Sequence, residues 1–231
     1  MPNLITENAL GADNHAGKIQ YNGSFDEKSL AYLFGVYLGD GSCSKFTNHH
    51  CFSIVSGDRD VIERTKNIVN LSLNKNYPLT YLKPNKTNLY RFRSWNKWLF
   101  MMLKSETANK TKIPQTVIDS KIEIIAEFVA GLMDTDGYIS TGKTRLGHQK
   151  FSLGFINSGE WLDPFITLLK FLEVKVGKKT LKKKYRSDNE KDCFQININL
   201  RSFVEAGLYF NCQRKQRILD KYKSNVRYQS Y

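Results

Sequence analysis

Two aspartates occupy positions at which a negative charge should be unfavourable. The segments 33–41 (LFGVYLGDG) and 129–137 (VAGLMDTDG) are apolar and helix-like, and their last acids, Asp40 and Asp136, each precede a glycine. A helix C-terminus carries partial negative charge, which disfavours acidic side chains there. A turn residue before glycine would explain one such aspartate. Two at matched positions indicate a site that uses carboxylates, whereas Asp134 has no acidic counterpart and is left out of it.

These positions belong to an internal repeat. Gly35 and Gly131 are separated by the same 96 positions as the two matched aspartates. Upstream of each segment an S-x-x-E sequence, starting at Ser24 and at Ser120, predicts a helix start with a capping box. Further along the chain the offset grows, which places small insertions in loops. The chain therefore contains two copies of one structural unit.

Each copy reads as helix, strand, strand, helix, strand, strand, helix, which makes the fold class α+β. In the first copy we expect helices at 25–38, 58–73 and 95–104 and strands at 42–46, 51–56, 78–83 and 88–94, and the second repeats them from 121 to about 222. The expected organisation is an N-terminal tail (1–23), a first half (24–104), a polar linker (105–120) and a second half (121–231).

The charge of the chain favours a polyanionic partner. Lys and Arg total 35 against 22 Asp and Glu, which gives a net charge of +13 and a pI near 9.5. Such a field attracts nucleic acid, although an acidic membrane surface would also fit it. No apolar run is long enough to span a membrane, and the N-terminal residues do not read as a secretory signal. We therefore expect nucleic acid as the partner and no membrane association.

The four cysteines form no CxxC pair. Cys43, His49, His50 and Cys51 lie close together, but they lack the usual spacing of a zinc finger and a second ligand pair. We interpret them as loop and strand residues of a protein in a reducing, intracellular compartment.

One expected strand in each half alternates between two kinds of side chain. Apolar residues alternate with amides in the second half and aromatic residues alternate with arginines in the first, which predicts a sheet with helices on one side only. Amide and arginine side chains suit base edges and phosphates, although an ordinary solvated face fits the alternation equally well. The polar members are Arg91, Arg93, Gln195, Asn197 and Asn199.

The two nine-residue segments resemble the LAGLIDADG motif of the homing endonucleases. The second segment is close to the motif, whereas the first departs from it, notably at Leu38, and keeps Gly35 and Asp40. The resemblance covers about residues 24–222, including the order of the elements and the repeat. Two such motifs about a hundred residues apart in one basic chain point to the single-chain type.

The resemblance implies two pseudo-symmetric αββαββα halves, with antiparallel sheets that form a DNA-binding saddle. The motif helices would pack side by side at a pseudo-twofold axis, where Gly35 and Gly131 let the backbones approach closely. The two motif aspartates would then face each other, and a divalent cation would remove their repulsion. We expect Mg²⁺, for which Mn²⁺ or Ca²⁺ can substitute in binding, with Gly39 and Thr135 as further metal-binding residues.

The implied activity is site-specific hydrolysis of one phosphodiester on each DNA strand, which leaves short 3′ overhangs. The metal held by Asp40 and Asp136 would polarise the phosphate and activate a water molecule. Lys112 and Lys215 are the expected catalytic lysines, with Lys110 and Arg214 as neighbouring basic candidates in the two halves.

The sheets would bind double-stranded DNA of roughly 20 base pairs. Because the symmetry already lies within one chain, we expect a monomer. The expected DNA-binding residues are Arg91, Arg93, Lys143, Arg145, Lys182, Lys184, Arg186, Gln195, Asn197 and Asn199.

Two other functions stay open on the same fold. An RNA-binding intron maturase would stabilise a folded intron, and a regulator would bind DNA without cutting it. Neither needs matched carboxylates, so the retention of Asp40 and Asp136 favours the nuclease.

Overall fold

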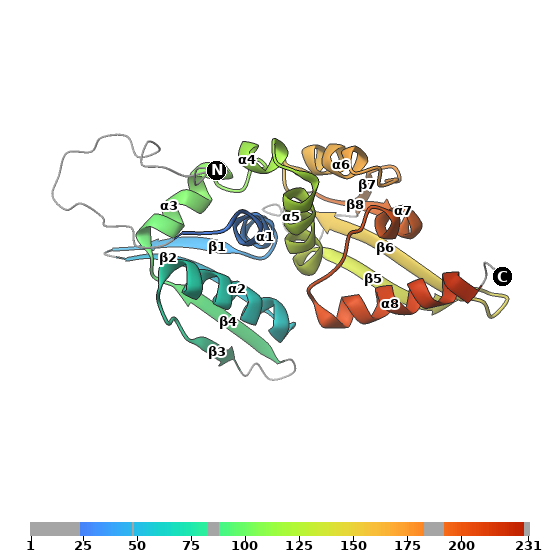
Figure 1. Ribbon diagram of the computed structural model, residues 1–231, viewed down its shortest axis with the longest axis horizontal. Helices are drawn as coiled ribbons and strands as arrows, with labels where there is room; N and C mark the ends of the chain where they lie inside the picture. The colour runs from blue at the N-terminus through green and yellow to red at the C-terminus, as the bar shows by residue number, and fades with distance from the viewer. Residues whose placement is uncertain (1–23, 48, 83–87, 183–191, 229–231) are drawn as a thin grey trace.

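The computed structural model describes residues 24–47, 49–82, 88–182 and 192–228 (Figure 1). Residues 226–228 are described by their backbone only. The elements of the first half are α1 (Glu27–Leu38), β1 (Ser42–Phe46), β2 (His49–Ser56), α2 (Arg59–Leu73), β3 (Leu79–Leu82), β4 (Leu89–Ser94) and α3 (Lys97–Glu106). After the short helix α4 (Gln115–Ile118), the second half consists of α5 (Ile122–Thr135), β5 (Gly137–Lys143), β6 (Gln149–Asn157), α6 (Leu162–Phe171), β7 (Thr180–Lys182), β8 (Cys193–Ile198), α7 (Leu200–Glu205) and α8 (Gln213–Tyr228).

Each half contains a four-stranded antiparallel sheet, with the order β1-β2-β4-β3 in the first and β5-β6-β8-β7 in the second. This arrangement confirms the predicted α+β fold with repeated αββαββα halves. Equivalent strands occupy equivalent places, so the sequence repeat is also a structural repeat.

Helices cover one face of each sheet. Helices α2 and α3 contact β4 and β2, whereas α7 and α8 contact β6 and β5. Phe155 of β6 packs against Phe165 of α6, with ring centroids 4.9 Å apart. The faces turned away from these helices carry Arg91 and Arg93 in the first sheet and Gln195 and Asn197 in the second, as strand alternation requires. We call them the open faces.

The motif helices α1 and α5 lie side by side between the two sheets (Figure 1). Their backbones touch, because a Cβ added to Gly35 would lie 2.3 Å from the carbonyl oxygen of Phe128. A Cβ on Gly131 would lie equally close to the carbonyl oxygen of Tyr32. The contacts advance together along both helices as far as Gly39, so α1 and α5 run parallel and end at the same level.

Both predicted capping boxes are wrong. Helix α1 is capped by Asp26, whose Oδ1 accepts a hydrogen bond from the backbone N–H of Ser29 at 2.9 Å. Helix α5 begins after Lys121 and has no side-chain cap. An aspartate accepts from the same backbone donors as a serine, so Asp26 can replace Ser24 in this role.

Three further elements differ from expectation. Helix α3 begins after Asn96, whose side chain accepts from the N–H of Leu99, and so lies two residues later than expected. The linker contains the single-turn helix α4. The second half ends in α8, a sixteen-residue helix that the repeat did not predict. None of the helices in the described ranges combines the length and apolar character needed to cross a membrane.

Candidate active site at the ends of the paired helices

The two motif aspartates come together where α1 and α5 end. Asp136 is the C-terminal cap residue of α5, and Asp40 directly follows Gly39, the cap residue of α1. A Cβ added to Gly39 would lie 3.1 Å from Oδ2 of Asp136 and would overlap Thr135, so no larger side chain fits between the helix ends. Asp40 is exposed and Asp136 is partly buried. Sequence analysis predicted this juxtaposition.

The protein raises the pKa of both aspartates. Burial and, after it, the neighbouring charge of Asp40 raise the pKa of Asp136 to about 6. A hydrogen bond of 2.7 Å from Nδ2 of Asn157 opposes this shift. The pKa of Asp40 is also raised, because protein atoms displace part of its water. The two carboxylates and the negative ends of both helices therefore concentrate negative charge in a partly desolvated place, and a bound cation would relieve their repulsion.

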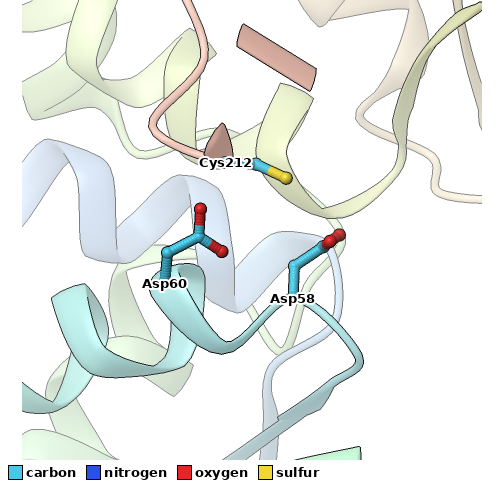
Figure 2. Close-up of side chains that lie close together, drawn as sticks. All are labelled: Asp58, Asp60 and Cys212. Carbon is cyan, nitrogen blue, oxygen red and sulfur yellow. The ribbon is translucent and has the colours of Figure 1, made fainter. Parts of the chain in front are cut away.

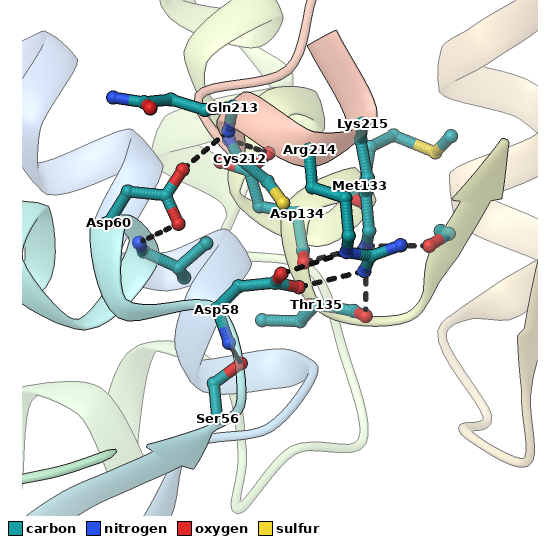
Figure 3. A network of polar contacts seen from close by, with 12 residues as sticks. Ser56, Asp58, Asp60, Met133, Asp134, Thr135, Cys212, Gln213, Arg214 and Lys215 are labelled. Carbon is teal, nitrogen blue, oxygen red and sulfur yellow. Dashed lines mark hydrogen bonds and ion pairs between the residues drawn. The ribbon is translucent and has the colours of Figure 1, made fainter. Parts of the chain in front are cut away.

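A buried lysine closes the end of α5. Nζ of Lys215, which is 4% exposed, shares its three N–H donors among four backbone carbonyl oxygens at the end of α5 and the start of β5. The accepting carbonyls are those of Met133 at 2.9 Å, Asp134 at 2.7 Å, Thr135 at 3.3 Å and Gly137 at 2.7 Å (Figure 3). A cation is favourable at the C-terminus of a helix, so Lys215 offsets the negative potential that disfavours the aspartates there.

The matching lysine at the end of α1 is Lys110, whereas Lys112 is exposed. Nζ of Lys110 donates to the carbonyl oxygens of Gly39 at 2.6 Å and Gly41 at 3.0 Å. Lys110, and not Lys112, therefore holds the helix end as Lys215 does, and the expected catalytic role of Lys112 stays a prediction. Lys110 and Lys215 are separated by 105 positions, close to the 104 that separate the register-equivalent residues Arg93 and Asn197.

Both lysines act on both aspartates. The positive charges of Lys110 and Lys215 lower the pKa of Asp40 and of Asp136 and so oppose the upward shift that burial causes. Burial lowers the pKa of both lysines. At Lys110 the negative charges of Asp136 and Asp40 oppose that shift.

The donor set fits a hard divalent cation that keeps other oxygen ligands. Two carboxylates at one place, with an exposed side at Asp40, suit Mg²⁺, which commonly takes one or two carboxylates with water and phosphate oxygens. The expected contribution of Gly39 and Thr135 to metal binding stays a prediction. Their carbonyl oxygens each accept a hydrogen bond, from Nζ of Lys110 and from Nζ of Lys215 respectively.

Asp134 has a structural position, consistent with its exclusion from the carboxylate pair. It is 2% exposed and accepts hydrogen bonds from Tyr32 Oη at 3.0 Å and from the N–H groups of Asn211 at 3.2 Å and Cys212 at 2.9 Å. Burial raises its pKa to about 6, and these hydrogen bonds oppose the shift. Asp134 therefore joins α1, α5 and the segment before α8.

A second acidic group lies beside the first half of the site. Ligand atoms of Asp58, Asp60 and Cys212 lie within 4.8 Å of one another (Figure 2). The carboxylates already have partners, because Arg214 binds Asp58 through two hydrogen bonds of 2.9 Å and the N–H of Gln213 donates to Asp60 (Figure 3). The group acts as a polar connection between α2 and α8.

The cysteines and histidines that suggested zinc do not converge. Strand alternation places His49 and His50 on opposite faces of β2. His49 contacts Trp95, with centroids 6.0 Å apart, and His50 contacts Phe100 at 4.8 Å. This geometry agrees with the interpretation of these residues as strand residues.

The open faces present the side chains that sequence alternation singled out. Arg91 and Arg93 pair with Val55 and Ser53 of β2, and Nε of Arg91 is buried without a hydrogen-bond partner. In the second sheet Nε2 of Gln195 donates to Oη of Tyr138 at 2.7 Å. Oη of Tyr138 in turn donates to Oδ1 of Asn197 at 3.2 Å. Sequence analysis missed Tyr138.

Other expected DNA-binding residues have mixed positions. Lys182 ends β7 on the open face, and Arg145 is exposed in the turn between β5 and β6. Lys143 lies on the face of Ile139, which packs toward α8, and Asn199 caps α7 by accepting from the N–H of Ser202 at 2.9 Å. Their expected DNA-binding roles stay predictions. Lys184 and Arg186 lie outside the described residues.

Solved structures share this fold. The chain superposes on I-DmoI, known from mesophilic variants of that homing endonuclease, with a TM-score of 0.52 and 16% identity, covering 78% of this chain and 93% of the other. For I-WcaI bound to its DNA recognition sequence the TM-score is 0.54 at 14% identity, covering 83% and 87%. For the LAGLIDADG homing endonuclease I-GzeII in complex with its DNA target it is 0.50 at 13% identity, covering 90% and 92%. The chain has the LAGLIDADG homing endonuclease fold.

Sequence comparison gives a narrower result. No protein-family model matches the sequence. A probable translation initiation factor IF-2 of Methanocaldococcus jannaschii is 26% identical over 215 residues, which cover 87% of this chain and 17% of that protein. The chain thus spans about a sixth of the length of the curated protein that it matches.

Proposed function

We propose that the protein is a site-specific, metal-dependent endonuclease that cuts both strands of a DNA duplex and leaves short 3′ overhangs. The observation that carries the proposal is the pair of carboxylates, Asp40 and Asp136, at adjacent helix ends. The net charge of +13 and a fold shared with structures bound to DNA targets support it. Structures of I-DmoI with DNA and Mn or Ca, or with its target DNA in the presence of Mg, support a divalent cofactor.

The residues of the chain have separate tasks in this proposal. Asp40 and Asp136 bind Mg²⁺, which supplies polarisation of the scissile phosphate and a lower pKa for an attacking water. Lys110 and Lys215 are anchored by helix-end carbonyls and bring positive charge to the phosphate, where negative charge develops during hydrolysis. Asn157 orients Asp136 through its hydrogen bond of 2.7 Å.

DNA lies along the two open faces in this proposal. A half that spans about one helical turn gives a target of roughly 20 base pairs. Arg91 and Arg93 contact the first half-site, whereas Gln195 and Asn197 contact the second. Because both halves belong to one chain, the protein acts as a monomer, and light scattering should give a mass near 26.7 kDa. A mass of twice that value would contradict the monomer.

We do not extend a translational role to this chain. The matched stretch makes up 17% of the initiation factor, and the carboxylate pair and the open faces suit a polynucleotide phosphate without reference to that protein.

The proposal is tested by incubating the protein with a randomised duplex DNA library and Mg²⁺ and sequencing the cleaved members. The wild-type protein should enrich one asymmetric sequence and leave 3′ overhangs. Asp136→Asn should bind the selected duplex but cut it at least 10²-fold more slowly, because one of the two metal carboxylates is lost. Cleavage by this variant at the wild-type rate would remove Asp136 from the metal site.

The maturase alternative makes a different prediction for the same variant. A protein that stabilises folded RNA should keep that activity in Asp136→Asn, since RNA binding needs no carboxylate pair. Absence of any duplex cleavage by the wild-type protein, together with tight binding to a structured intron RNA, would favour the maturase.

A further inference from the structure

The open face of the first sheet ends in a group of aromatic side chains that the proposed chemistry does not use. Phe46 at the end of β1 is 50% exposed, and Trp95 just after β4 is 46% exposed. Their ring centroids are 5.8 Å apart, and His49 contacts Trp95 at 6.0 Å. We call these three residues the outer aromatic cluster.

Strand register places the cluster on the open face. Phe46 pairs with His49, and the alternation of β1 puts Phe46 on the same side as Ser42, which pairs with Ser53. Ser53 in turn pairs with Arg93 of the open face, and Trp95 is two residues beyond Arg93. The cluster and the arginines therefore form one continuous surface.

The internal repeat shows that the cluster is not required by the fold. The residues at the equivalent register positions of the second sheet are Gly142, Lys150 and Asn199. A glycine, a lysine and an amide occupy the same places without disturbing the strand order. Packing within the sheet thus does not demand exposed aromatic residues, and a contact outside the protein accounts for them better.

The chemistry of duplex DNA indicates which group the outer aromatic cluster would contact. Stacked bases present only their edges to a sheet lying in the major groove, and the apolar group on those edges is the C5-methyl of thymine. Phosphates and the other base edges are polar, and the neighbouring Arg91 and Arg93 suit them. An exposed apolar patch bordered by arginines on a DNA-binding face therefore matches a thymine-bearing stretch.

We propose that the outer aromatic cluster reads thymine methyl groups in the outer part of the half-site bound by the first sheet. This inference rests on the proposed DNA-binding function. Phe46 is four residues beyond Ser42, or about 14 Å along the strand, and the base-pair rise is about 3.4 Å. The thymines should thus lie roughly four base pairs outside the position of cleavage. The opposite half-site, which faces Gly142 and Lys150, should lack this preference.

The test uses the duplex selected from the randomised library. Replacing the outer thymines by deoxyuridine removes only their methyl groups, and binding by the wild-type protein should weaken about three- to fivefold for each methyl lost. The same replacement at the other end of the duplex should have no effect. Trp95→Ala and Phe46→Ala should bind thymine and deoxyuridine duplexes equally well.

Phe171→Ala is the matched control, because Phe171 is 63% exposed on α6, away from the open face. It should keep the full discrimination between thymine and deoxyuridine. Discrimination that is absent in the wild-type protein, or that persists in both cluster variants, would overturn the inference.

Two further outcomes would also overturn it. Lower thermal stability of the cluster variants with unchanged discrimination would show that the aromatic residues only pack against the protein. Weaker binding of these variants to single-stranded or folded RNA, with duplex binding unchanged, would assign the cluster to RNA stacking. If the wild-type protein neither binds nor cuts any duplex, the proposed function fails before the cluster is tested.

Discussion

Two features of the fold disfavour the ionised form of Asp136: its side chain is partly buried, and the negative charge of Asp40 lies nearby. Its folded pKa of about 6 lies above the value of an exposed aspartate, so the folded protein holds a proton that the unfolded chain has released between about pH 4 and 6. Stability therefore falls as pH rises through this window, and the cost is fully present at pH 7. The carboxylate required by the proposed activity is one that the fold would be more stable without.

Asp136→Asn should accordingly stabilise the protein. We expect a gain of about 1–2 kcal/mol at pH 7 that disappears near pH 4, because the neutral amide keeps an acceptor for Asn157 and removes the repulsion. Urea denaturation at both pH values measures it, with Glu123→Gln, an exposed carboxylate in the same helix, as the control. A loss of stability at pH 7 would contradict this account of the site.

The two candidate lysines of the first half can be separated in the same way. Lys110→Met should slow cleavage by about 10²-fold, because it removes a positive charge that lies beside both carboxylates. Lys112→Met, which removes an exposed lysine two residues away, should cut at nearly the wild-type rate. Single-turnover cleavage of the selected duplex gives both rates. Equal loss in the two variants would place the charge requirement in DNA binding and not at the helix ends.

At the scale of elements, the contact between α1 and α5 sets the position of both carboxylates. Glycine costs about 1 kcal/mol in a helix interior relative to alanine, so Gly35 and Gly131 are locally unfavourable. They are tolerated because each faces the backbone of the other helix with no room for a Cβ. The separation of the helix ends, and with it that of the aspartates, depends on this contact.

Gly35→Ala should therefore destabilise the protein by about 3 kcal/mol or more, despite the better helix propensity of alanine. Gly142→Ala is the control, since a Cβ at Gly142 meets nothing within 4 Å, and it should leave the free energy of unfolding nearly unchanged. Thermal and urea denaturation compare the two. A neutral Gly35→Ala would mean that the helices can separate without cost.

The sequence predicted those features that repeat or alternate. The matched glycines and aspartates identified the helix pair, and strand alternation identified Arg91, Arg93, Gln195 and Asn197. It did not predict which polar residue caps a helix. Asp26 and Asn199 are helix caps through local hydrogen bonds that several polar residues nearby could equally have made.

The position of α8 shows the same limit. Among the described elements, the equivalent stretch after α3 contains only the single-turn helix α4, so the repeat did not predict a long helix there. Its start is fixed by contacts to distant segments, through Arg214 to Asp58 and through Lys215 to the end of α5.

At the scale of the whole molecule, a set of buried and partly buried polar contacts connects the halves. Asp134 accepts hydrogen bonds from α1 and from the segment before α8, and Arg64 of α2 donates to Glu127 of α5 at 2.9 Å. Oη of Tyr209 also donates to Glu127 at 2.6 Å. The halves thus share more than an apolar contact, and we expect them to unfold in one transition.

Asp134→Ala tests this connection. It leaves one hydroxyl and two backbone N–H groups without an acceptor, which should lower the free energy of unfolding by about 3 kcal/mol or more. Asp119→Ala, at an exposed carboxylate between the halves, should cost much less. Circular dichroism and intrinsic fluorescence should report coincident transitions in the wild-type protein. Two separate transitions would show that the halves are independent.

The sharing of both lysines by both aspartates has a consequence for how such a protein can be divided. A half expressed alone, even with the linker, would contain one aspartate and one lysine, whereas the pKa of each aspartate depends on both lysines. Separate fragments would then be inert until they meet, and a chimera joining halves of different origin would need compatible lysines as well as compatible glycines. The smallest unit that evolution or engineering can recombine is therefore the interface itself.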